Sequence, residues 1–323
     1  MCTAITFKAN DHYFGRNLDL EYNYNEEVVI TPRNYKFKFR LQPEMKQTFA
    51  IIGIATVSNN YPLYYDATNE YGLSMAALNF PGNAVYQEPD ANKVNIAPFE
   101  FIPWTLGQCR TVKEVQGLLD GTNLVNIPFS KEYPLSPLHF MISDKNKSIT
   151  VEPVKNGLII YDNPIGVLTN NPPFEYHMHN LCNYLNLTSE EPINRFSDAI
   201  KITPYSRGMG AIGLPGDLSS SSRFIRAAFT KFNALSGATE NESVNQFFHI
   251  LGSVVQQEGC VKVNGKYEKT VYSSCCNTDR CIYYYKSYEN SQVSSVCLYR
   301  ENLEKSELIR YPLIYEQHFF NMN

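Results

Sequence analysis

Residues 1–20, MCTAITFKANDHYFGRNLDL, place a cysteine directly behind the initiator methionine and follow it with two short runs of strand-forming residues. The turn-like pair Asn10-Asp11 joins CTAITF to HYFGRNL, so we expect the two runs to pair as a hairpin. A small second residue permits the removal of Met1 by methionine aminopeptidase. Cys2 is therefore a candidate for the first residue of the mature chain.

An amino-terminal cysteine combines a nucleophile with a base. A thiol attacks as thiolate and has a free pKa of about 8.5, and an α-amino group, with a pKa of about 7.7 to 8.0, can accept its proton. The hairpin would bring Arg16 and Asp19 towards Cys2, where the arginine would stabilise a thiolate and the aspartate would hold an ammonium. The alternatives are an ordinary small residue at the start of a strand and an exposed ion pair.

Composition and charge exclude several classes of protein. The 323 residues carry a formal net charge of −4, which offers no basic surface for a nucleic acid. The charged residues Asp11, Arg16, Asp19 and Glu21 occupy the place of a signal-peptide core, so we expect a cytoplasmic protein. The apolar run FAIIGIATV at 49–57 is too short to span a membrane and predicts a buried strand.

Short aromatic and β-branched runs, separated by turn residues, predict strands over most of the chain. A helix with a break near Cys109 is expected at 97–119, and three further helices are expected at 172–185, 221–235 and 242–255. Strands in consecutive blocks indicate antiparallel sheets with helices on their outer faces. No internal repeat or linker divides the chain, so we expect one domain over residues 1–323.

The cysteine and histidine patterns do not indicate a metal site. Cys275, Cys276 and Cys281 form no CxxC pair and have no histidine nearby, so buried thiols in a strand and a turn are favoured over zinc. His177 and His179 are two residues apart on a predicted helix and should point to different faces. We expect no metal, no cofactor and no cysteine–histidine dyad.

Five separated motifs carry a resemblance to a known family: MCTAITF (1–7), FGRNLDLEY (14–22), AALNFPG (76–82), GVLTNNP (166–172) and GLPGDLSSSSRFIRAAF (213–229). In this order and spacing the chain resembles the choloylglycine hydrolase family of N-terminal-nucleophile hydrolases, and within it the bacterial bile salt hydrolases. The resemblance covers essentially the whole chain. It implies an α+β fold, the four-layer αββα sandwich of two antiparallel sheets.

The resemblance also implies a catalytic set on these motifs: Cys2, Arg16, Asp19, Asn79, Asn170 and Arg223. Cys2 resembles the nucleophile, and Arg16 and Asp19 resemble the residues that hold and tune it. The two asparagines resemble the groups that orient the amine and receive the oxyanion, a role that suits an uncharged amide donor. Arg223 resembles the active-site arginine of the family.

Two positions in these motifs leave the assignment open. Asn171 directly follows Asn170, so either asparagine could face the nucleophile, whereas Arg226 is expected to lie behind Arg223. Aromatic loops and one glycine-rich loop supply weaker candidates for substrate contacts. These candidates are Tyr22, Tyr24, Phe129 and Arg207.

The activity that the resemblance implies is hydrolysis of glycine- or taurine-conjugated bile salts by a homotetramer that needs no cofactor. A penicillin V acylase, or another N-acyl amidase, is the alternative enzyme. In the penicillin V acylases the position of Asn79 is typically tyrosine, which favours bile salts. A non-catalytic steroid-binding protein on the same scaffold is the alternative from another class.

Overall fold

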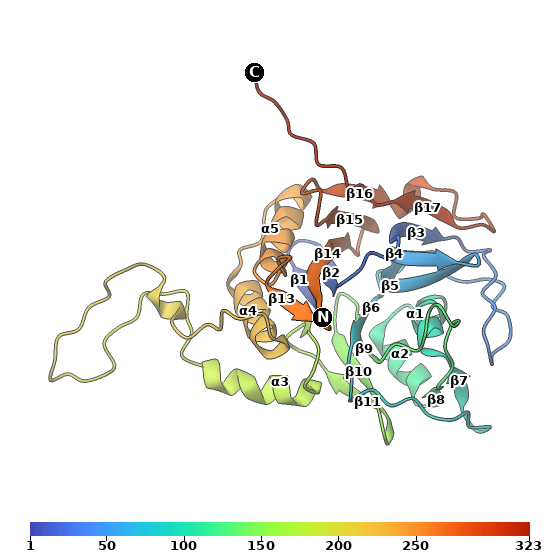
Figure 1. Ribbon diagram of the computed structural model, residues 1–323, viewed down its shortest axis with the longest axis horizontal. Helices are drawn as coiled ribbons and strands as arrows, with labels where there is room; N and C mark the ends of the chain where they lie inside the picture. Colours follow the sequence, from blue (N-terminus) through green and yellow to red (C-terminus); the bar gives the residue numbers. More distant parts are fainter.

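The computed structural model describes residues 1–323 and consists of two large antiparallel sheets that face each other, with helices on their outer sides (Figure 1). The first sheet has the order β12 (Val167–Leu168), β1 (Cys2–Lys8), β2 (His12–Leu20), β14 (Lys266–Asn277), β15 (Ile282–Ser287) and β16 (Ser294–Cys297), and β13 (Val261–Val263) pairs with β14. The second has the order β11 (Gly157–Asp162), β10 (Ser148–Val154), β9 (Leu138–Ser143), β6 (Ser74–Asn79), β5 (Tyr61–Asn69), β4 (Ile51–Ser58), β3 (Glu27–Thr31) and β17 (Ile309–Pro312).

The helices form the two outer layers. The first sheet is covered by α4 (Ser220–Asn233) and α5 (Glu240–Gly252), and α3 (Phe174–Asn180) packs beside α4. The second sheet is covered by α1 (Phe101–Leu106) and α2 (Val112–Leu119), next to the small parallel pair β7 (Val94–Ile96) and β8 (Thr122–Leu124). The predicted four-layer αββα sandwich is therefore confirmed (Figure 1).

The hairpin at the chain start forms as predicted and lies inside the first sheet. In it β1 pairs with β2 so that Cys2 faces Leu18 and Ala4 faces Arg16. Successive side chains of a strand point to opposite faces, so Arg16 and Leu18 are directed to the second sheet and Asp19 to the helical side. Because both faces of β2 are covered, the strand is buried almost throughout. This alternation divides the polar residues of the hairpin between two layers.

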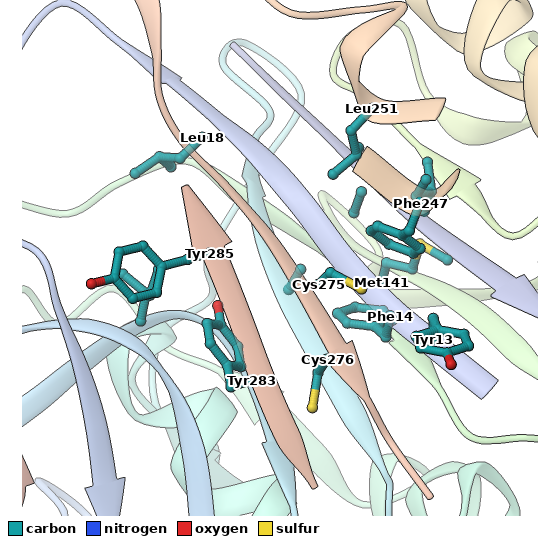
Figure 2. Close-up of a cluster of buried hydrophobic side chains, with 14 of the residues drawn as sticks. Tyr13, Phe14, Leu18, Met141, Phe247, Leu251, Cys275, Cys276, Tyr283 and Tyr285 are labelled. Carbon is teal, nitrogen blue, oxygen red and sulfur yellow. The ribbon is translucent and has the colours of Figure 1, made fainter. Parts of the chain in front are cut away.

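Bulky side chains fill the space around the first sheet (Figure 2). Phe14 of β2 and Phe247 of α5 belong to the same buried cluster as Met141 of β9 in the other sheet. Cys275 and Cys276 are consecutive on β14 and fully buried. Such neighbours face opposite sides of a strand, and the strand predicted for them is confirmed.

The differences from prediction concern short elements. The expected helix at 97–119 is broken into α1 and α2, as predicted. The run SVCLYREN at 295–302, whose β-branched and aromatic residues predict a strand, is extended only as far as Cys297 and continues as a 3₁₀ turn. The short strands β7, β8, β13 and β17 were not predicted because each has only three or four residues, too few for a period to be read. Helices that combine the length and the apolar character needed to cross a membrane are absent from the structure.

His12, at the first position of β2, is expected to make the fold sensitive to acid. Burial lowers its pKa from 6.5 to about 4, against a smaller opposing effect of Asp279. Between these values the unfolded chain binds a proton that the folded chain does not, so stability is complete above pH 6.5 and falls as the pH drops towards 4. The loss of folding stability across this pH window is on the order of 3 kcal/mol in the wild type. We expect His12→Gln, which can keep the hydrogen bond to Ser143, to abolish this loss.

The measurement is the free energy of unfolding in urea at pH 7.5 and at pH 4.5 for both proteins. The decrease between the two pH values should be smaller in His12→Gln than in the wild type. His249→Gln, on the exposed side of α5, is the control and should keep the wild-type decrease. Equal decreases in all three proteins would contradict the role of His12.

Candidate active site

Cys2 lines a cavity of about 350 Å³ between the two sheets. Its residue is 2% exposed, and 15 of the 23 residues that line the cavity are hydrophobic. The walls come from β5 and β6, from α1 and the turn before it, and from the loop that leads into β9. They consist of Leu63, Tyr64, Tyr65, Ala77, Pro98, Phe99, Ile102, Ile127, Pro128, Phe129, Tyr133, Pro134, Leu135 and Leu138. A largely apolar ligand would fit here, with its reactive bond at the cysteine.

Asn170 and Arg223 hold the backbone of Cys2. The Cys2 backbone nitrogen donates to Asn170 Oδ1 at 2.8 Å, and Arg223 Nη2 donates to the same oxygen at 2.7 Å. Arg223 Nη1 donates to the carbonyl oxygen of Cys2 at 2.5 Å and to Thr3 Oγ1 at 2.6 Å. The neighbouring Asn171 turns away and donates to the carbonyl of Pro81. Of the two adjacent asparagines, Asn170 is thus the one that faces Cys2.

Arg16 places a buried cation at the inner end of the cavity. Its Nη1 donates to the carbonyls of Tyr65 at 3.0 Å and Ala77 at 2.5 Å, on the facing sheet, while Nη2 has no partner. Burial alone would lower the pKa of the guanidinium, but the acidic groups around it, Cys2 and Tyr272 first among them, raise it above its ordinary value. Arg16 is therefore a permanent positive charge on the cavity wall beside the thiol.

Asp19 lies on the helical side of the first sheet, close to the chain start. Its Oδ1 accepts a hydrogen bond from Thr270 at 2.6 Å, and its Oδ2 lies 3.9 Å from Arg223 Nη1. Burial raises the pKa of the carboxyl, and the positive charges of Arg223 and the amino terminus act in the opposite direction. The amino group of Met1 donates to the Asp19 carbonyl at 2.7 Å and pairs with the Glu268 carboxylate.

Asn79, the last residue of β6, supplies a free amide at the cavity. Its side chain lines the cavity and makes no hydrogen bond, whereas its carbonyl accepts from Asn170 Nδ2 at 2.7 Å. One N–H of Asn170 is therefore engaged, and its oxygen is directed to Cys2 N. The arrangement combines a thiol, free amide donors and an apolar cavity, the requirements of acyl transfer from an amide.

The weaker candidates for substrate contacts separate into two groups. Tyr24 and Phe129 line the cavity. The hydroxyl of Tyr22 instead accepts a hydrogen bond from Lys266, which also covers its ring, and Tyr22 does not line the cavity. Arg207 is exposed on the long segment between α3 and α4, which projects from the body of the molecule (Figure 1), and does not reach the cavity within this chain.

Several residues of the site carry no signal in the sequence. Thr3, Thr270 and Ser220 hold Arg223, Asp19 and Asn170 in place, but they read as ordinary strand or helix residues. Leu63 and Tyr65 line the cavity from a strand that predicts only a core. The prolines around Phe129 are the one sign that the loop preceding β9 has a fixed shape.

The four-layer sandwich and the cysteine that begins its inner hairpin place the chain among hydrolases of the N-terminal-nucleophile fold. The model of the family of linear amide C–N hydrolases, choloylglycine hydrolase family, matches residues 2–311. The chain belongs to this family, so the resemblance seen in the sequence is confirmed.

Individual relatives cover the whole chain. A bile salt hydrolase/transferase of Lactiplantibacillus plantarum is 57% identical over 324 residues, which are 100% of each chain. The crystal structure of a mutant conjugated bile acid hydrolase from Clostridium perfringens superposes with a TM-score of 0.92 at 36% identity, again over 100% of both chains. A penicillin V acylase from Agrobacterium tumefaciens has a TM-score of 0.75 at 17% identity, over 96% of this chain and 90% of the other, which shows a shared fold alone.

Proposed function

We propose that the protein is a bile salt hydrolase, which cleaves the amide bond of glycine- or taurine-conjugated bile salts. The observation that carries the proposal is the largely apolar cavity that Cys2 lines together with Asn79, whose side-chain amide is free. A conjugated bile salt has matching chemistry, because a rigid apolar steroid leads to a single amide near a charged end. The names of the relatives from L. plantarum and C. perfringens support the same substrate class.

The proposed reaction proceeds through a thioester. The Cys2 thiol, once Met1 has been removed, transfers its proton to the α-amino group and attacks the amide carbonyl carbon. Asn79 and the remaining N–H of Asn170 stabilise the oxyanion of the tetrahedral intermediate. The C–N bond then breaks, and the ammonium of Cys2 returns the proton to the departing glycine or taurine.

Water completes the cycle. The α-amino group takes a proton from the attacking water, the C–S bond breaks, and the free bile acid leaves with the thiol restored. Asn170 and Asp19 hold the α-amino group, Arg16 stabilises the thiolate, and Arg223 fixes Asn170 against the Cys2 backbone. Tyr24 and Phe129 contact the steroid from the cavity wall. No cofactor takes part in these steps.

We also propose that the enzyme is one domain over residues 1–323 and acts in the cytoplasm as a homotetramer. Large apolar side chains on the projecting segment between α3 and α4 support association with further copies of the chain. Phe196 and Tyr205 are more than four-fifths exposed in the isolated chain, an unusual state for side chains of this size.

A side-by-side assay on glycocholate, taurocholate and penicillin V tests the proposed function. We expect both bile salts to be hydrolysed with a higher kcat/KM than penicillin V, because the cavity is largely apolar and position 79 is asparagine. Cys2→Ala, measured in parallel, corrects for contaminating amidases. Faster turnover of penicillin V would instead favour a penicillin V acylase, and bile salt binding without turnover would favour a steroid-binding protein.

A further inference from the structure

Two buried histidines lie behind the candidate active site and have no part in the proposed chemistry. His139 of β9 and His177 of α3 are both 0% exposed, and neither lines the cavity. His139 Nε2 lies 3.0 Å from the carbonyl oxygen of Thr169, and His177 Nε2 lies 3.0 Å from that of Asn170. The two rings thus contact the carbonyls of consecutive residues, Thr169 and Asn170, in the segment that follows β12 and places Asn170 next to Cys2.

His139 also reaches the segment that carries the other asparagine. Its ring is stacked on Phe80, with centroids 4.3 Å apart and planes 6° from parallel. Phe80 is fully buried and directly follows Asn79. A single imidazole therefore contacts both segments, Asn79-Phe80 through its face and Thr169-Asn170 through its edge.

The polar partners of His139 are costly to bury. Its Nδ1 lies 3.1 Å from Glu152 Oε1, which also accepts the backbone N–H of Phe174 at 2.9 Å, and Glu152 is buried as well. Both ring nitrogens therefore lie within hydrogen-bond distance of a buried oxygen atom. Replacing both partners of a buried hydrogen-bonded pair by apolar side chains of the same shape can be nearly neutral or even stabilising. The pair is therefore better explained by the geometry it imposes than by stability.

We propose that His139 is a positioning residue for the oxyanion site, because it sets the placement of Asn79 relative to Asn170. The Glu152 carboxylate orients the imidazole ring, which contacts the Thr169 carbonyl through Nε2 and the Phe80 ring through its face. A hydrogen bond of 2.7 Å from Asn170 Nδ2 to the Asn79 carbonyl joins the two segments directly. The inference rests on the proposed function in one respect, that these asparagines stabilise an oxyanion during amide hydrolysis.

The test compares His139→Phe, which can keep the stack on Phe80 but loses both polar bonds, with His139→Gln, which can still donate to the Thr169 carbonyl. We expect His139→Phe to lower kcat about 10- to 100-fold, the effect of a small misplacement of catalytic groups, with KM within about twofold of wild type. His139→Gln should restore part of the loss. Rates are expressed per Cys2 thiol titrated, so a smaller folded fraction does not count as slower chemistry.

Coupling to the oxyanion donor separates positioning from general destabilisation. If His139 acts through the asparagines, His139→Phe should reduce kcat much less in an Asn79→Ala background than in the wild type. The loss should also be the same factor on every amide that the wild type hydrolyses, because the oxyanion is common to all of them. Phe80→Leu, which removes the stack and no polar group, should lower kcat in the same direction and serves if His139→Phe does not fold.

The outcomes distinguish the two proposals. An unchanged kcat per titrated thiol in both His139→Phe and Phe80→Leu, with normal wild-type turnover, would overturn the positioning role alone. Full additivity with Asn79→Ala would also overturn it. Wild-type protein that hydrolyses penicillin V and not bile salts would contradict the proposed substrate. It would still support the positioning role if His139→Phe lowers kcat on penicillin V by the expected factor. No turnover of any amide would overturn both proposals.

Discussion

Cys2→Ala is expected to lower the hydrolysis of glycocholate by at least about 10⁴-fold, the scale seen when the nucleophile of a comparable enzyme is removed. The physical reason is that Cys2 supplies the only thiol among the residues that line the cavity. Without it the free amide of Asn79 still binds and polarises the substrate, but no bond can form to the carbonyl carbon. Cys2→Ser keeps the shape of the side chain but offers a poorer nucleophile, so its rate of hydrolysis should lie between those of Cys2→Ala and the wild type.

The fold should survive both substitutions, because Cys2 has a small side chain at the start of β1, which lies between β12 and β2. The backbone hydrogen bonds of Cys2 to Asn170 and Arg223 do not involve the sulfur. Circular dichroism and the thermal midpoint check this directly. Cys260→Ala, at an exposed thiol outside the site, is the matched control and should keep wild-type activity. Comparable activity in Cys2→Ala and the wild type would exclude Cys2 as the nucleophile.

The state of Met1 separates the amine-base mechanism from other thiol mechanisms. With Met1 attached, the Cys2 nitrogen is a peptide N–H that donates to Asn170 and has no lone pair available to accept a proton. Protein prepared with methionine aminopeptidase inhibited should therefore retain Met1 by intact mass and be nearly inactive. Full activity of this species would require a base other than the α-amino group.

The strands, the helices and the antiparallel pairing were predictable from the sequence because their signals are local, whereas the four-layer arrangement was implied by the family resemblance. The Asn10-Asp11 turn between two strand-forming runs predicts the hairpin, and the helical patterns at 221–235 and 242–255 become α4 and α5. The site is not local, since Cys2 and Arg223 are 221 positions apart and meet through a backbone carbonyl. The spacing of residues says nothing of such a contact, so Asn79, Asn170 and Arg223 became candidates only through the family resemblance. The predicted hairpin, in contrast, already brought Arg16 and Asp19 towards Cys2.

Side-chain direction was the main gap in the prediction. Tyr22 and Tyr24 are two residues apart in one aromatic loop and looked equivalent, but Tyr22 is held by Lys266 and only Tyr24 lines the cavity. Similarly, the adjacent Asn170 and Asn171 differ because the amide of Asn170 bonds to Cys2 in β1, whereas that of Asn171 bonds to Pro81 in the turn after β6. These choices depend on residues far along the chain, which a local pattern does not contain.

Arg223→Met is expected to destabilise the protein by about 3 to 5 kcal/mol, the cost of removing one partner from a buried charge pair. The guanidinium is fully buried and bonds to the Cys2 carbonyl, Thr3 Oγ1, Asn170 Oδ1 and, through Nε, the carbonyl of Leu218 at 3.0 Å. Methionine fills a similar volume but satisfies none of these oxygens. It also leaves the Asp19 carboxylate, 3.9 Å from Nη1, without its compensating charge.

A double-mutant cycle with Asp19→Asn isolates the electrostatic part of this loss. Because asparagine carries no charge, Arg223→Met should cost less in the Asp19→Asn background, by about 1 to 3 kcal/mol, as is usual for residues that share a buried network. Activity should not recover in the double variant, since the bonds from Arg223 to Asn170 and to the Cys2 backbone remain missing. Urea unfolding and the glycocholate assay measure the two effects separately.

Arg226→Met, one helical turn further along α4, is the matched control. Arg226 is only half-buried and donates to the Gly216 carbonyl at 3.0 Å, away from Cys2, so its replacement should change the free energy of unfolding by less than about 1 kcal/mol. Equal changes in the free energy of unfolding for Arg223→Met and Arg226→Met would show that the buried charge of Arg223 does not stabilise the fold. No coupling between Arg223→Met and Asp19→Asn would instead assign the loss of stability to the missing hydrogen bonds, because the charge of Asp19 would then not interact with that of Arg223.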